Sequence, residues 1–389
     1  MTAEVSLWIG VYKSFTPGIF EAHLKPHGCT EQTAEKFRKA FDELSQAGRK
    51  RQRIEERCPA PSLLGDESEW STNQKTLGIL CHRPPPAKCH GLHVSLQVEP
   101  FATFMDVSDI KSEVDHKYTD IALEIMCQLS KIQSEETMKT GLKTQLEKVF
   151  SKYSVKSVNW SETSAAGNSD ISILSGVYTL LNIELKKGLG SGGKDANFEN
   201  TGYFIKIQRN HQLQRAPMFL VSIVGCHYLQ VFGAVWDGEC VCVDPLCSPL
   251  SLLYVAHDPN DGVMKVARLL SALATAVDKL NKYDKGTMPK SGPYFNTFNN
   301  IELKNMKKIA NKNRVFRATA DGTHVVVKFV LGKYGLRAHK CLAEENLAPQ
   351  VLHSADLPGG WVVVVMEKIQ DSTPLSEARM NEDLKASLR

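Results

Sequence analysis

The chain has 389 residues, 42% of them hydrophobic and 23% charged, which is the composition of a globular protein with room for two or three domains. Its formal net charge of +4 permits a nucleic-acid partner but is too small to argue for one. The 10 cysteines lack the spacing of a disulfide framework and no secretory signal precedes them, which argues against a secreted disulfide scaffold. We therefore expect an intracellular protein, in the nucleus or the cytoplasm.

Residues 1–110 have few periodic apolar positions, so we expect a poorly defined region dominated by loops and linkers. Its basic run at 49–53 is either a nuclear-import signal or the solvated end of a helix. Four side chains between 81 and 90 are candidate zinc ligands, although the Cys-x7-Cys spacing differs from that of common zinc modules. They are Cys81, His82, Cys89 and His90.

Residues 111–285 have the pattern of one mixed domain. Apolar residues at three- and four-residue spacings predict helices over 118–132 and 134–153, and alternating apolar residues predict several strands after them. A helical segment at 195–214 interrupts the strands, and an amphipathic helix at 264–283 ends the domain. This order predicts an α/β or α+β fold.

The most apolar window, 218–236, has about the length of a membrane span. It is rich in β-branched and aromatic residues and is interrupted by Gly225, Cys226 and His227. These features favour two core strands over a membrane helix, so we expect no membrane contact.

A second, smaller and strand-rich domain is expected over 300–389, after a linker at 286–299. Residues 314–330 read as two strands around an Asp-Gly turn, and a helical segment separates them from an apolar strand at 361–369.

The segment 169–188 predicts a hairpin with charged residues gathered at one end. Glu184 and Lys186 are two residues apart on a strand and so face the same side of the sheet. Antiparallel pairing brings Asp170, at the start of the preceding strand, to the same end. Two carboxylates on rigid strands can hold Mg²⁺, and a lysine beside them can act on a phosphodiester. The alternative is an exposed ion pair of little energetic weight.

A further acid, Glu135, is expected on the apolar stripe of the helix that precedes the strands. It shares this stripe with Met138, Leu142 and Leu146. A buried acid needs a partner, which a metal ion or Lys186 would supply. The alternative is that Glu135 begins the helix, where the helix dipole favours it and exposure is cheap.

The glycine-rich stretch 188–193 fits G-x-G-x-x-G, but no acid follows where a dinucleotide site needs one. Lysines and arginines outnumber acids between 186 and 215, so this segment either contacts a nucleic-acid backbone or is an ordinary basic helix face. The basic candidates are Lys187, Lys194, Lys206 and Arg209.

Asp170 followed by Glu184-Leu185-Lys186, behind a helix that carries Glu135, resembles the PD-(D/E)XK nuclease superfamily, with Ser169 where the motif has proline. The sequences of 182–204 and 216–246 are similar to the nuclease region of Crinkler-type proteins. The resemblance implies a restriction-endonuclease-like αβββαβ core, Mg²⁺ held by Asp170 and Glu184, Lys186 acting on the attacking water, and Glu135 as accessory acid. Glu199 and Tyr203 match a Q-x-x-x-Y motif of some relatives, with Glu in place of Gln, and this motif adds Tyr203 to the nucleic-acid candidates.

The C-terminal segment resembles a protein-kinase N-lobe, with Lys328 as the nucleotide-binding lysine and the hinge at Met366 and Glu367. The glycines that close over phosphates are missing, and no H-R-D or D-F-G follows, so a complete kinase is not expected. We expect a truncated lobe that binds a protein partner. Nucleotide binding through Lys328 and Glu367 and a solvated strand lysine are the alternatives.

The first functional hypothesis is thus a metal-dependent nuclease acting on DNA or RNA. The second is a catalytically inactive scaffold built from a nuclease fold and a kinase-like lobe, possibly a Crinkler-like effector. An ATP-binding, kinase-like protein is the third.

Overall fold

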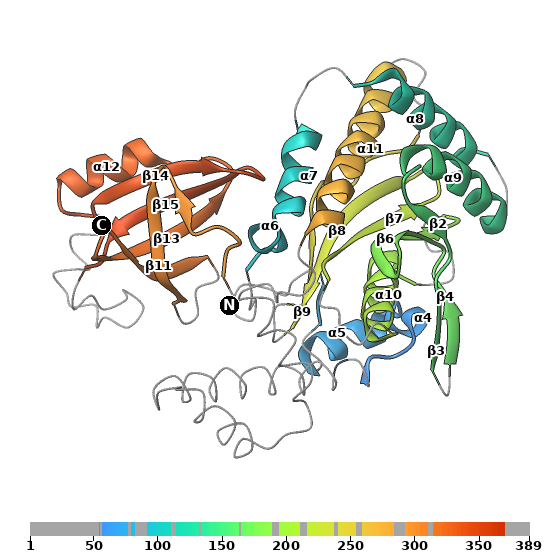
Figure 1. The fold of residues 1–389 in the computed structure, drawn as a ribbon, viewed down its shortest axis with the longest axis horizontal. Helices are drawn as coiled ribbons and strands as arrows, with labels where there is room; N and C mark the ends of the chain where they lie inside the picture. The colour runs from blue at the N-terminus through green and yellow to red at the C-terminus, as the bar shows by residue number, and fades with distance from the viewer. Residues whose placement is uncertain are drawn as a thin grey trace, which may run out of the picture. The chain divides into compact units, whose positions relative to one another are not determined.

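The computed structural model describes residues 54, 57–76, 79–81, 92–109, 114–131, 134–162, 165–188, 194–210, 216–236, 240–253, 259–283, 292–309 and 314–369. These residues form two compact units that divide between Tyr294 and Phe295 (Figure 1). The division falls inside the linker predicted at 286–299. Helices and strands mix in the first unit, which confirms the predicted α+β class.

A seven-stranded sheet forms the centre of the first unit, in the order β1-β9-β8-β7-β6-β5-β2. β2, β5 and β6 form an antiparallel meander, whereas β7 runs parallel to β6 after a crossover through a helix, α10 (Ala196–Asn210). The strands are β1 (Ile79–Cys81), β2 (Ser154–Lys156), β5 (Ile171–Ser175), β6 (Tyr178–Lys186), β7 (Met218–Val224), β8 (Tyr228–Trp236) and β9 (Val241–Pro245), and β3 (Asn159–Glu162) and β4 (Ala165–Asn168) make a separate hairpin.

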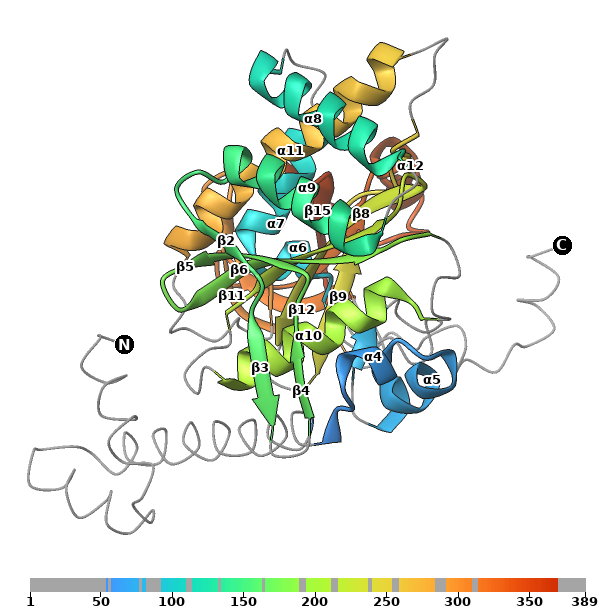
Figure 2. The ribbon, with the colours of Figure 1, turned by 90° about the vertical axis from the view of Figure 1, so that its right-hand side faces the viewer.

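Helices cover both faces of this sheet, which explains why strand β7 reads as a continuous apolar run. One face packs on α7 (Glu99–Asp109), α8 (His116–Leu129), α9 (Glu135–Val149) and α11 (Pro259–Lys282). The other face packs on α10, and a short helix, α4 (Pro61–Leu64), lies along α10 (Figure 2). Because side chains alternate along β6, Ile183 and Leu185 join the first core while Asn182 and Glu184 face α10.

The expectation of loops and linkers up to residue 110 is wrong for 92–109. Here α6 (Val94–Gln97) and α7 belong to the core of the first unit, and the rings of Phe101 and Phe104 lie 4.8 and 5.9 Å from that of Phe219. Gly233 on β8 makes this contact possible, because a Cβ there would lie 2.8 Å from the Phe101 ring. Another helix, α5 (Glu67–Thr76), and strand β1 also belong to this N-terminal stretch.

Several N-terminal candidates lie outside the described residues, including the basic side chains at 49–53 and the possible zinc ligands His82, Cys89 and His90. Cys81 is described and is fully buried in strand β1. The window 218–236 forms strands β7 and β8 around a turn in which Gly225 has a φ of +50°, as predicted. Among the described helices, none has the length and apolarity that crossing a bilayer requires.

The second unit is a six-stranded antiparallel sheet in the order β10-β11-β12-β13-β15-β14. The predicted Asp-Gly turn joins β12 to β13, and Asp321 and Gly322 both have positive φ. The rings of Phe316 and Phe329 pack in its core, 5.7 Å apart. The elements are β10 (Thr297–Phe298), β11 (Ile301–Lys308), β12 (Val315–Ala320), β13 (Thr323–Leu331), α12 (Leu336–Glu344), β14 (Val351–Leu357) and β15 (Trp361–Glu367).

Candidate active site

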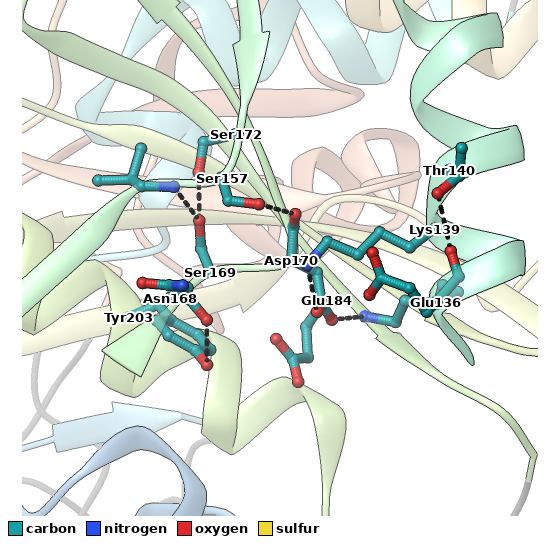
Figure 3. Close-up of polar contacts among 12 residues, drawn as sticks. Glu136, Lys139, Thr140, Ser157, Asn168, Ser169, Asp170, Ser172, Glu184 and Tyr203 are labelled. Carbon is teal, nitrogen blue, oxygen red and sulfur yellow. Dashed lines mark hydrogen bonds and ion pairs between the residues drawn. The ribbon is translucent and has the colours of Figure 1, made fainter. Parts of the chain in front are cut away.

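The charged end of the β5–β6 hairpin gathers Asp170 and Glu184 (Figure 3). Ile171 pairs with Ile183 in antiparallel register. Asp170, which precedes Ile171, therefore lies opposite Glu184, which follows Ile183. The backbone N–H of Leu185 donates to Asp170 Oδ2 at 2.9 Å and fixes that carboxylate at the strand end. The juxtaposition expected from strand alternation is therefore present.

Glu184 carries a buried oxygen to which no residue that the structure describes donates a hydrogen bond. Its side chain is 3% exposed, and its Oε1 accepts from Lys186 Nζ at 2.7 Å, so the oxygen without a described donor is Oε2. Burial, followed by the charges of Asp170 and Glu199, raises the pKa of Glu184 well above its ordinary value despite Lys186. An unpaired buried carboxylate oxygen is costly, so this atom is suited to binding a proton or a cation.

Lys186 lies between two carboxylates from different elements. Its Nζ is 2.7 Å from Glu184 Oε1 and 2.5 Å from Glu199 Oε2, which comes from α10. Burial opposes the charge on Lys186, but Glu184 and Glu199 outweigh this effect and raise its pKa, so the side chain is an ammonium ion. The alternative of a merely exposed ion pair is wrong, because both side chains of the Glu184–Lys186 pair are at least 86% buried (14% and 3% exposed).

Glu135 lies at the rim of this group. The apolar members of its predicted stripe are buried, but Glu135 itself is exposed, directly after the N-cap Ser134 whose Oγ accepts from the Thr137 amide at 3.2 Å. The prediction of a buried Glu135 is thus wrong, because Glu135 begins the helix, where the helix dipole favours an acid and exposure is cheap. Partial burial and the charge of Asp170 nevertheless raise its pKa, while Lys186 and the Lys187 amide act in the opposite direction. One turn later, Lys139 Nζ lies 3.6 Å from Asp170 Oδ1.

The group as a whole holds more carboxyl groups than ammonium groups. It comprises the carboxyl groups of Glu135, Asp170, Glu184 and Glu199 and the ammonium groups of Lys139 and Lys186. In the part of the chain that the structure describes, no three His, Cys, Asp or Glu side chains form a metal-binding group. Mg²⁺ is often held by only one or two carboxylates with water and phosphate oxygens, so Asp170 and the open Glu184 Oε2 fit such an ion.

Two of the candidate nucleic-acid contacts are wrong. Lys206 is 3% exposed and donates to the carbonyl of Cys58 at 2.8 Å, and the buried Tyr203 donates to the carbonyl of Asn168 at 2.9 Å. Both are covered because α10 is enclosed between the sheet and the segment that includes α4 (Figure 2). Lys187 is exposed and Lys194 is half-buried, while the side chain of Arg209 and the loop 189–193 lie outside the described residues.

In the second unit, the lysine of the candidate nucleotide site has different neighbours from those of Lys186. Lys328 is half-buried on β13, with its Nζ 5.5 Å from the centre of the Tyr334 ring. No carboxylate within the described residues forms an ion pair with it. Glu367, at the end of β15, is exposed and accepts from the Gln350 amide at 2.9 Å, and Met366 beside it is buried.

Glu199 is the site residue that sequence reasoning missed. Its motif match with Tyr203 located it on a helix, but the partner of its carboxylate depends on how that helix lies on the sheet. Comparisons with protein-family models, curated proteins and solved structures found no significant match to this chain. Its function must therefore be argued from the chemistry of the site.

Proposed function

We propose that this protein is a metal-dependent nuclease that hydrolyses phosphodiester bonds of DNA or RNA, with Asp170, Glu184 and Lys186 at its reacting centre. One observation carries the proposal: among the described residues, none donates a hydrogen bond to the buried carboxylate oxygen Glu184 Oε2, although a second carboxylate and a partly buried ammonium lie beside it. Buried polar atoms without partners are rare in folded proteins and often belong to functional sites.

The proposed roles follow from charge and burial. Asp170 and Glu184 would hold Mg²⁺, which supplies Lewis-acid polarisation of the phosphodiester when bound. Lys186, an ammonium held at 2.7 Å from Glu184, would orient the attacking water and stabilise charge on the phosphate. Glu135 at the rim would act as accessory acid, and the exposed Lys187 together with Lys194 would contact the nucleic-acid backbone.

The order of elements is consistent with this proposal. A helix, three antiparallel strands, a second helix and a strand parallel to the third follow one another as α9, β2, β5, β6, α10 and β7, with β3 and β4 inserted. This is the order expected of a restriction-endonuclease-like core, and it supports the proposal.

A catalytically inactive scaffold is the second candidate, favoured by the burial of Lys206 and Tyr203, which removes two expected nucleic-acid contacts. The second unit fits a protein-binding role better than an ATP site. Its strand order, with α12 between β13 and β14, supports a partial kinase-like lobe, but Lys328 contacts an aromatic ring where a nucleotide site needs an acidic partner. ATP is expected to produce no thermal shift.

The test is hydrolysis by the purified chain of plasmid DNA, single-stranded DNA and RNA, each with Mg²⁺, Mn²⁺ or EDTA. Asp170→Asn and Glu184→Gln keep the side-chain shape and remove the charge, and each should lower the rate by about 100-fold or more. Glu136→Gln, an exposed neighbour on α9, is the matched control and should cleave like the wild type. Cleavage that survives both site variants, or none by the wild type with any substrate, would refute the nuclease.

A further inference from the structure

The proposed reaction leaves one buried carboxylate without a role. The side chain of Glu199 is 6% exposed, and its Oε2 lies 2.5 Å from Lys186 Nζ, an ion pair that lacks the geometry of a hydrogen bond. A buried carboxylate is expensive to maintain, and here its charge is balanced by the ammonium that also binds Glu184. The two contacts of Lys186 therefore come from two elements, strand β6 and the helix α10 that follows it in the chain.

The helix that carries Glu199 is held firmly against the sheet. Asp195 caps its first turn by accepting from the amides of Asn197 and Phe198 at 2.8 and 3.0 Å. Asn200, the neighbour of Glu199, donates to the carbonyl of Val221 at 3.0 Å and accepts from Asn182 at 2.8 Å. Both asparagines are fully buried, so this helix cannot move away from the sheet without leaving polar groups unpaired. The backbone position from which the Glu199 side chain extends is thus fixed.

The second contact of Lys186 explains how Glu184 keeps an open oxygen. An ammonium has three donors, and without Glu199 they would be free to turn toward both oxygens of Glu184. With Glu199 in place, Lys186 contacts Glu184 through Oε1, and no described residue donates a hydrogen bond to Oε2. We infer that Glu199 is a positioning residue, which holds the Lys186 ammonium against one oxygen of Glu184 and so keeps the other oxygen open to a divalent cation. This inference rests on the proposed function of the same site.

The direct test is calorimetric titration of the full chain with Mn²⁺ alone, without nucleic acid. We expect Glu199→Gln to raise the Kd for Mn²⁺ about tenfold, because its amide binds the ammonium weakly and Lys186 then closes over both oxygens of Glu184. Glu199→Asp keeps the charge but shortens the reach by one methylene group, so it should also raise the Kd. Glu136→Gln removes one exposed charge from α9 and should leave the Kd within twofold. In hydrolysis, Glu199→Gln should lower kcat and leave the KM for nucleic acid unchanged.

The possible results separate the two proposals. Wild-type Mn²⁺ affinity in both Glu199 variants would overturn the role of Glu199 and leave the nuclease proposal standing. Mn²⁺ binding that depends on Glu199, in a wild type that cleaves no substrate, would support the positioning role and refute the nuclease. A wild type that binds no Mn²⁺ would overturn the inference. If Glu199→Gln does not fold, as judged by circular dichroism, Glu199→Asp decides the question.

Discussion

Two strand lysines, Lys186 on β6 and Lys328 on β13, are both candidates for a functional role, yet their surroundings differ. Lys186 lies between two buried carboxylates at 2.7 and 2.5 Å, whereas Lys328 is half-buried beside an aromatic ring. The helix nearest the first, α10, is buried from residue 196 to 207, while only Ala343 is buried in α12 of the second unit. A lysine on a strand therefore gains a chemical role from the groups that other elements bring to it.

Replacing Lys186 and Lys328 in turn is expected to give the largest difference, both in the free energy of unfolding and in cleavage. Lys186→Met leaves two buried carboxylates uncompensated and should lower the free energy of unfolding by about 3 kcal/mol, the lower end of the cost of breaking a buried pair, because the carboxylates can take up a proton. It should also abolish Mg²⁺-dependent cleavage. Lys328→Met should change the free energy of unfolding by less than about 1 kcal/mol and leave cleavage intact, since its ring contact is partly exposed. Urea denaturation measures the free energy of unfolding of both variants, and equal losses of stability would contradict the distinction between the two lysines.

The packing around α10 and α12 can be compared by adding one methyl group within α10 and one at the N-cap of α12. In α10, a Cβ on Gly202 would lie 2.8 Å from the Cα of Pro61, so Gly202→Ala must displace backbone of α4. Alanine favours a helix by about 1 kcal/mol, but overpacking costs about 1–3 kcal/mol, so we expect a net loss of about 1 kcal/mol. Gly335, which precedes α12, has open space around it, and Gly335→Ala should stay within about 0.5 kcal/mol of the wild type. A stable Gly202→Ala would show that α4 is not tightly held.

The smallest expected effect is a pH dependence of stability that comes from Glu184 in the candidate active site. Burial and neighbouring charges raise the pKa of Glu184 above that of the unfolded chain, so the folded protein retains a proton that the unfolded chain releases. Between the two pKa values, stability therefore falls as pH rises. In EDTA, Glu184→Gln should match the wild type below the ordinary pKa of a glutamate and exceed it above that value. Thermal unfolding across pH measures the difference, and parallel curves for the two proteins would show that Glu184 is not perturbed.

Much of the architecture could be predicted from local patterns. The helices predicted near 118–132, 134–153, 195–214 and 264–283 are present as α8, α9, α10 and α11, because the periodicity of apolar residues reports directly on which face is buried. The segment 92–109 was missed, since α6 is one short turn and α7 lacks a long apolar repeat. Its burial depends on a partner strand more than a hundred residues away, where Gly233 leaves space for Phe101.

The residues of the candidate site likewise divide into those that local patterns predict and those that depend on tertiary packing. By itself, the sequence determined that Glu184 and Lys186 share a face and that Asp170 joins them, because strand alternation and hairpin pairing are properties of a short stretch of backbone. Only the tertiary structure decided that Glu199 reaches Lys186 and that Lys206 turns inward to the carbonyl of Cys58. Those contacts depend on which helix covers which face of the sheet. That choice is made by the packing of whole layers, and no local pattern of residues specifies it.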